Sequence, residues 1–302
     1  MKGQALTALA VLAFTVCMCG SGALASPHPQ SKERSKSDAD INAIGNRHVV
    51  RDVNFYSVEK EKEIGKTLAD EVERSSKLVQ DPTVTEYCKR VAQKVANNSD
   101  AGMPITVHVI DSNAVTAFTL AGGYQYVSRG LLLRLENEAE LASVLARGIA
   151  HTALRSATKE ATKAQLIQAA TIPVVASGPG SSSVSGVSLT IPLSQLKMKR
   201  DDELDADYFG IQYVYKAGYD PECFTNFLQR IWGSNAAATD STPKVLSDYP
   251  PLDERLAALR KEISKILPPR DGAIISTPEF AAFKEHLRAQ KSEDLKQPTE
   301  EH

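Results

Sequence analysis

The pentapeptide Arg147-Gly148-Ile149-Ala150-His151 carries the most suggestive chemistry in the sequence. In the zinc-peptidase motif His-Glu-x-x-His, two histidines one helical turn apart point at one metal ion, and the glutamate takes a proton from metal-bound water. Here only the second histidine, His151, is present. Arg147 stands at the first ligand position and Gly148 at the general-base position. Alone, a single helical histidine is more often structural than a ligand, so its surroundings must decide.

Those surroundings predict a long helix beside a small sheet. The helix is expected from about residue 138 through 157, extending towards 170, because apolar residues recur along one face. Residues 105–110 alternate and are β-branched, which predicts a strand, and 117–120 with 124–128 predict a hairpin around Gly122-Gly123. Apolar periodicity predicts further helices at 58–78, 82–97, 200–216, 221–232, 251–266 and 278–290. The fold class is therefore α+β and predominantly helical.

Six segments flank or follow the pentapeptide in a fixed order. They are Gly122–Val127, Arg129–Leu132, Asn137–Ala142, Asp202–Gly210, Ala217–Pro221 and Tyr249–Arg255. In order and spacing this set resembles the HtpX-like and prenyl-endopeptidase-like zinc metallopeptidases, peptidase family M48. It is most similar to the periplasmic members that carry a signal sequence, and the resemblance covers roughly residues 55–266.

The resemblance implies a gluzincin-type metallopeptidase fold with a small mixed sheet and hairpin beside the active-site helix. It assigns His151 to the second histidine ligand and Glu203 to the third zinc ligand, on a later helix. Asp207, four residues on and thus on the same helical face, corresponds to the acid that orients a ligand. Tyr249 stands where the family commonly has a histidine and is expected at the site wall.

The resemblance also places a peptide groove at the hairpin, because the edge of this sheet holds extended peptide by strand addition. The expected groove residues are Ala117, Phe118, Gly122, Gly123 and Tyr124.

The departures from the family pattern fall on its chemistry. An arginine cannot replace a zinc ligand, because its guanidinium stays protonated and has no lone pair to give. We therefore expect no catalytic residue and no bound cofactor, and we expect Arg147 to fill the metal position and pair with Glu203, Asp207 or both. The alternative is that Arg147 turns to solvent. Gly148 either makes room for Arg147 or a neighbouring segment, or reflects drift after activity was lost.

The amino terminus predicts export. Lys2, an apolar run over residues 5–17 and Ala23-Leu24-Ala25 fit a signal peptide over residues 1–25. The expected product is periplasmic or extracellular and has no transmembrane segment. A lipoprotein is less favoured, because neither Cys17 nor Cys19 directly follows small residues.

The remaining domain boundaries follow from composition. Residues 26–51 are polar and are expected to be a disordered lead-in, 52–267 form the metallopeptidase-like domain, and 268–302 form a C-terminal helix and polar tail. A net charge of −2 and the lack of a basic stripe argue against nucleic-acid binding. Cys88 and Cys223, each on an apolar helix face, are either buried thiols or a disulfide, which an oxidising compartment permits.

Three functions remain open from the sequence. The first is a pseudopeptidase that binds unfolded or extended polypeptide, including envelope proteins, in its groove. The second is an active zinc-dependent metalloendopeptidase with an unconventional site built from His151, Glu203 and Tyr249 or another group. The third is a structural envelope protein whose groove is closed by the loop 177–188.

Overall fold

The computed structural model describes residues 35–171, 200–233 and 250–294. The expected signal peptide, the loop 177–188 and Tyr249 lie outside these residues. No helix within them is long and apolar enough to cross a membrane.

A three-stranded mixed sheet lies at the centre of the described chain. Its strands are β1 (Thr106–Ile110), β2 (Ala117–Thr119) and β3 (Tyr124–Ser128), in the order β1-β3-β2. β3 pairs in parallel with β1 and antiparallel with β2. The alternation of β1 places Val107 and Val109 on one face, where both are buried. This is the strand and hairpin that the sequence predicts.

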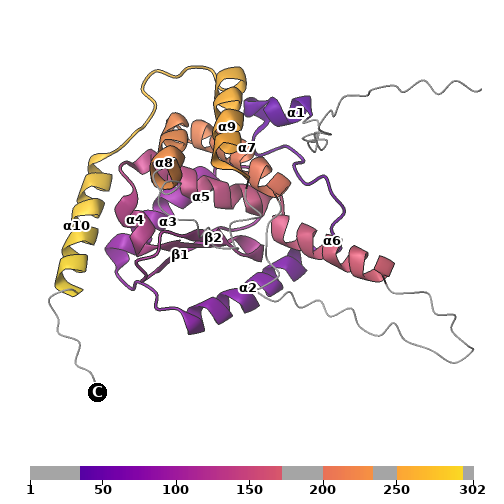
Figure 1. Ribbon diagram of the computed structural model, residues 1–302, viewed down its shortest axis with the longest axis horizontal. Coiled ribbons are helices and arrows are strands. Elements are labelled where there is room, and N and C mark those ends of the chain that lie inside the picture. Colours follow the sequence, from indigo (N-terminus) through magenta and orange to yellow (C-terminus); the bar gives the residue numbers. More distant parts are fainter. Residues whose placement is uncertain (1–34, 172–199, 234–249, 295–302) are drawn as a thin grey trace, which may run out of the picture. The chain divides into compact units, whose positions relative to one another are not determined.

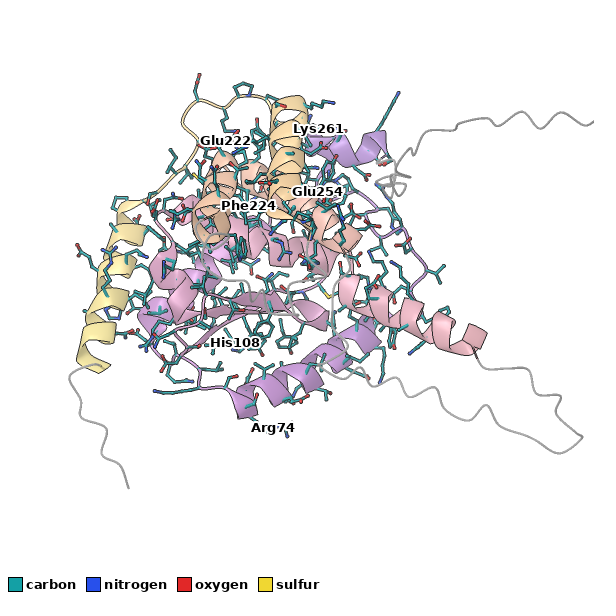
Figure 2. The ribbon with its side chains drawn as sticks, viewed as in Figure 1. Arg74, His108, Glu222, Phe224, Glu254 and Lys261 are labelled. Carbon is teal, nitrogen blue, oxygen red and sulfur yellow. The ribbon has the colours of Figure 1, made fainter. Side chains whose placement is uncertain are left out.

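Helices cover both faces of the sheet (Figure 1). α2 (Val58–Ser75) lies on one face, where Tyr126 of β3 packs with its apolar residues. α5 (Glu138–Ala153) and α3 (Pro82–Ala96) lie on the other, and their residues form a larger core with Val107, Val109 and Val127. His108 of β1 lies between the sheet and α2 (Figure 2). Its ring stacks on that of Tyr126, with ring centroids 5.2 Å apart. Each half-buried strand thus supplies apolar residues to two cores.

The remaining helices surround this centre. They are α4 (Arg129–Arg134), α6 (Ser156–Thr171), α7 (Arg200–Lys216), α8 (Glu222–Gly233), α9 (Leu252–Ile266) and α10 (Pro278–Asp294), with the short α1 (Lys36–Ala39), η1 (Ile41–Ala43) and η2 (Ala121–Gly123). The predominantly helical α+β class is confirmed. α4 is not among the helices predicted from apolar periodicity, because six residues are too few to show a period.

The expected long helix is two helices. α5 ends at Ala153 and α6 begins at Ser156, because Arg155 adopts a left-handed backbone with φ of 53°. Its guanidinium holds this break: Nε lies 2.6 Å from a carboxylate oxygen of Glu61, and Nη2 donates to the carbonyl of Tyr56 at 2.7 Å. Residues 156–171 are helical as expected, but the prediction of one unbroken helix was wrong, and His151 lies in the last turn of α5.

Residues 35–51 fall within the span expected to be a disordered lead-in, and part of this segment packs against the domain. Ile44 and Val49 are buried in the larger core, and Arg47 is paired with Asp100 at 2.5 Å. The polar average composition of the segment gives no sign that Ile44 and Val49 are buried in the core. The core continues beyond residue 267, because Phe280, Phe283 and Leu287 of the expected C-terminal helix, α10, are buried in it.

Both described cysteines are free, buried thiols. Cys88 of α3 and Cys223 of α8 pack among apolar residues of the larger core. Burial raises the pKa of each thiol to about 12. Of the two alternatives given above, buried thiols or a disulfide, the structure contains buried thiols.

Candidate active site

The candidate site forms where α5 crosses α7. His151 in the last turn of α5 and Glu203 in the first turn of α7 are both buried, with Nε2 and Oε1 3.8 Å apart. Asp207 lies one turn after Glu203 and is also buried. The structure therefore brings together the three residues that the resemblance assigns to a zinc centre.

Arg147 occupies the remaining corner of the site. Its guanidinium pairs with Glu203, and its Nε lies 3.1 Å from Oδ1 of Asp207. The Arg147 side chain is only 19% exposed, and that of Glu203 is 1% exposed. The expected ion pair is therefore present and involves both carboxylates, and the alternative in which Arg147 turns to solvent was wrong.

A second arginine completes the charge balance. Arg255 of α9 donates two hydrogen bonds to Asp207, from Nε to Oδ2 at 2.7 Å and from Nη2 to Oδ1 at 2.9 Å. This two-point contact fixes Asp207 in orientation as well as charge. Arg255 was not predicted to be a site residue, although it interrupts the apolar face of α9 between Leu252 and Leu256. An arginine on an apolar helix face is the signal that could have identified it.

His151 is held neutral by this environment. Burial is the largest cause that lowers its pKa well below the usual 6.5, and the positive charges of Arg147, Lys159 and Arg255 lower it further. Its Nδ1 lies 3.3 Å from the hydroxyl of Ser156. An imidazole in this state contributes a dipole and no charge to the site.

Gly148 makes room for the sheet. A Cβ on this glycine would lie 2.5 Å from the Thr119 hydroxyl oxygen and 2.8 Å from Cδ of Gln125. Side chains from β2 and β3 therefore approach α5 at the position where the family motif has its general base. The space left by the absent side chain of Gly148 is therefore taken by a neighbouring segment, which is one of the explanations given above for this glycine. The Nε2 of Gln125 is buried there, with no hydrogen-bond partner among the residues that the structure describes.

The residues present do not fit a catalytic zinc ion. Such a site uses three protein ligands with lone pairs, and a protonated guanidinium has none. Across residues 35–171, 200–233 and 250–294, no group of three or more His, Cys, Asp or Glu could hold a metal ion. Arg147 instead places positive charge between the two acids that would face the metal.

The outer edge of β2, which pairs with none of the described segments, lies next to this site. On either side of β2, the amide of Leu120 donates to the carbonyl of Tyr124 at 2.8 Å, and the amide of Ser128 donates to the carbonyl of Thr116 at 3.0 Å. The backbone groups of even-numbered residues in this segment therefore point towards β3. Backbone groups alternate along an antiparallel strand, so those of Ala117 and Thr119 point to the free side.

No other described segment pairs with β2. The outer edge of β1 is covered by residues 77–79, where Val79 donates to Val109 and Asp111 donates to Lys77, both at 2.8 Å. The β2 edge is therefore the one that could accept an added strand.

The expected groove residues divide between this edge and the turn. Ala117 and Phe118 belong to β2, and the Phe118 ring stacks on Tyr126. Gly122 and Gly123 have positive φ and form the turn packed against α2 and Pro104, where a Cβ on Gly123 would lie 2.1 Å from a carbonyl oxygen. Tyr124 begins the central strand, which is paired on both sides. The close packing of the turn therefore accounts for Gly122 and Gly123 without any role in peptide binding.

Comparison with known proteins identifies the relatives of this chain. The sequence profile of peptidase family M48 matches residues 82–263. The chain is 25% identical to the beta-barrel assembly-enhancing protease of Yersinia pestis over 222 residues, which cover 70% of this chain and 46% of that protein. It is 28% identical to the mitochondrial metalloendopeptidase OMA1 of Schizosaccharomyces pombe over 181 residues, 59% of this chain and 52% of that protein. The chain thus spans about half the length of these curated relatives.

Proposed function

The chain belongs to peptidase family M48, and we propose that it is a pseudopeptidase that holds extended polypeptide at its sheet edge without cleaving it. The family consists of zinc metallopeptidases. The observation that carries the proposal is the guanidinium of Arg147 between Glu203 and Asp207, next to an open β2 edge. The hydrolytic groups are replaced, whereas the means of binding a strand is kept.

Catalysis by the family chemistry needs a metal-bound water and a base beside it. In this chain the base position is Gly148, and two side chains of the sheet fill the adjacent space. The ion pair links α5 to α7, which gives it the structural role that a metal would have between two helices. The fold is then expected to be independent of zinc.

Polypeptide binding is supported by the geometry of β2. An added strand would bond to the backbone groups of Ala117 and Thr119, as in other cases of strand addition. Backbone pairing of this kind reads no particular sequence, which suits an unfolded or extended partner.

We propose that these partners are envelope proteins met after export. The relatives in Yersinia pestis and Escherichia coli K12 are named beta-barrel assembly-enhancing proteases, which ties that function to those proteins. A signal peptide over residues 1–25 would bring this chain to the same surroundings. Detection of the mature chain in a periplasmic fraction, with cleavage after Ala25, tests this part of the proposal.

The binding test exploits the direction of one amide. Ala117→Pro removes a donor on the free side of β2 without breaking a bond to β3, whereas Ala117→Ser at the same position keeps the donor. One backbone hydrogen bond contributes about 1 kcal/mol, so Ala117→Pro should weaken binding of an unfolded fluorescent reporter about fivefold. Ala117→Ser should bind as the parent does, and chelator should change neither. Equal binding by both variants would exclude the β2 edge.

The catalytic test addresses the one observation that favours a residual protease, the 3.8 Å approach of His151 to Glu203. Casein incubated with the full chain and added zinc should remain intact. Cleavage that is lost with chelator and with His151→Ala would instead establish an unconventional metalloendopeptidase and end the pseudopeptidase proposal.

A further inference from the structure

A basic cavity lies at the Val115 end of the open edge. Its volume is about 800 Å³, and it lies among α4, α8 and α10. Val115, two residues before β2, is 40% exposed and lines the cavity with Ile231 and Phe280. The pocket thus has an apolar wall that continues the line of the strand.

Four cations line the same cavity, against two carboxylates. The cations are Arg134, Arg230, Lys284 and Arg288, and the carboxylates are Glu136 and Glu285. Arg230 is already engaged by two carboxylates, with its Nη2 2.6 Å from buried Glu140 and its Nε 3.1 Å from Glu136. Exposed Arg134 and Arg288 have no side-chain partner within the part of the chain that the structure describes. Arg134 and Arg288 therefore outnumber Glu285, the remaining carboxylate of the lining, and this part of the wall carries a net positive charge.

The wall that carries these charges is firmly held. The ammonium of Lys284 is buried and donates to the carbonyl oxygens of Leu132, Leu133 and Leu135 at 2.7–2.8 Å. Phe283, on the same helix, stacks on Tyr87 with ring centroids 4.5 Å apart. α10 is thereby fixed to the end of α4 and to α3, so the cavity is preformed and binding need not order it.

The position of the cavity relative to β2 determines which end of an added strand would reach it. Val115 lies two residues before Ala117, a separation of about 7 Å at the usual rise of an extended chain. Antiparallel pairing is slightly the more stable arrangement. A strand added antiparallel to β2 runs from Thr119 towards Val115, and its carboxyl-side residues arrive at the cavity.

We propose that this cavity binds the acidic segment that follows the paired stretch of a bound polypeptide. The inference rests on the proposed binding at β2 and names its client class: extended chains whose pairing segment is followed by aspartate or glutamate. Arg134 and Arg288 supply the attraction, and the apolar wall accepts the intervening side chain.

The test uses three fluorescent peptides with the same alternating threonine–valine stretch, followed by glutamates, glutamines or lysines. The glutamate peptide should bind the full chain about three- to tenfold more tightly than the glutamine peptide, and the lysine peptide should bind most weakly. Arg134→Gln with Arg288→Gln should remove the difference, whereas Arg74→Gln, on the exposed side of α2 (Figure 2), should leave it. Added salt should reduce the preference, because exposed charges are screened.

The outcomes separate this inference from the proposed function. Equal binding of the three peptides, lost with Ala117→Pro, would leave strand addition standing and overturn the acidic pocket. A glutamate run placed before the paired stretch that binds as well as one placed after it would also overturn the pocket. Failure of every peptide to bind would refute strand addition itself.

Discussion

Replacing Arg147 by methionine tests the central claim that a guanidinium holds the site together. The substitution leaves Glu203, at 1% exposure, charged and without its main partner, while His151 beside it is neutral. Breaking a buried pair by removing one side costs about 3–5 kcal/mol. Arg147 is 19% exposed, so water can partly solvate the remaining charge, and Asp207 keeps Arg255. We therefore expect the lower end, about 3 kcal/mol.

A double-mutant cycle measures whether this loss comes from the pair. Glu203→Gln removes the buried charge but keeps its volume, and Arg147 then still has Asp207, so a smaller loss is expected. The double variant Arg147→Met with Glu203→Gln should be about as stable as Glu203→Gln alone. That result corresponds to a coupling energy of about 3 kcal/mol, equal to the loss for Arg147→Met alone and within the range for residues in direct contact.

The assay is urea unfolding followed by far-UV circular dichroism, which gives the free energy of unfolding for each variant. The parent protein should unfold at the same urea concentration with and without chelator. A loss below about 1 kcal/mol for Arg147→Met, or single losses that simply add, would show that the pair does not hold the helices. A chelator-induced drop in the parent would show that a metal does.

Three further predictions concern other groups. The pKa of His151 is lower in the folded protein than its unfolded value of 6.5, so its neutral form stabilises the fold above pH 6.5, and this contribution is lost as the pH falls below that value. Relative to His151→Gln, the parent should lose about 1.4 kcal/mol of unfolding free energy between about pH 7.5 and 5.5, measured by urea unfolding. Parallel pH profiles for the two proteins would contradict this. Gly65→Ala should cost about 3 kcal/mol of stability, because the new Cβ would lie 2.1 Å from a backbone carbonyl oxygen of the hairpin turn. Gly102→Ala, whose Cβ would have no atom within 4 Å, should cost little. Equal losses for the two variants in thermal unfolding would refute this. Cys88 and Cys223, with pKa values near 12, should react with a disulfide reagent only as fast as the protein unfolds, so rapid labelling of the native chain would mean that the thiols are accessible.

Local patterns predicted the elements of this fold well. The N-cap Asp81 followed by proline places the start of α3, and the hairpin around Gly122-Gly123 has the predicted pairing. These signals act over a few residues, so they can be seen without the fold. The break at Arg155 could not be, because its left-handed backbone depends on Glu61, which is 94 residues away in the chain.

The same division applies to the candidate site. The spacing within each helix put Arg147 and His151 on one face, and Glu203 and Asp207 on another. The register of the family motif then linked the two faces. The place of Arg255 on the apolar face of α9 marks it as unusual, but its pairing with Asp207 depends on how α9 packs, which local spacing does not give.

The sequence by itself determined that the pentapeptide Arg147–His151 lacks a ligand and a base, since residue type alone fixes whether a group has a lone pair or a carboxylate. Tertiary structure decided what took their place. Whether an arginine pairs or turns to solvent depends on the distance and burial of acids from another helix, and whether Gly148 is empty space depends on side chains from the sheet. Composition fixes which interactions are possible, whereas packing fixes which of them form.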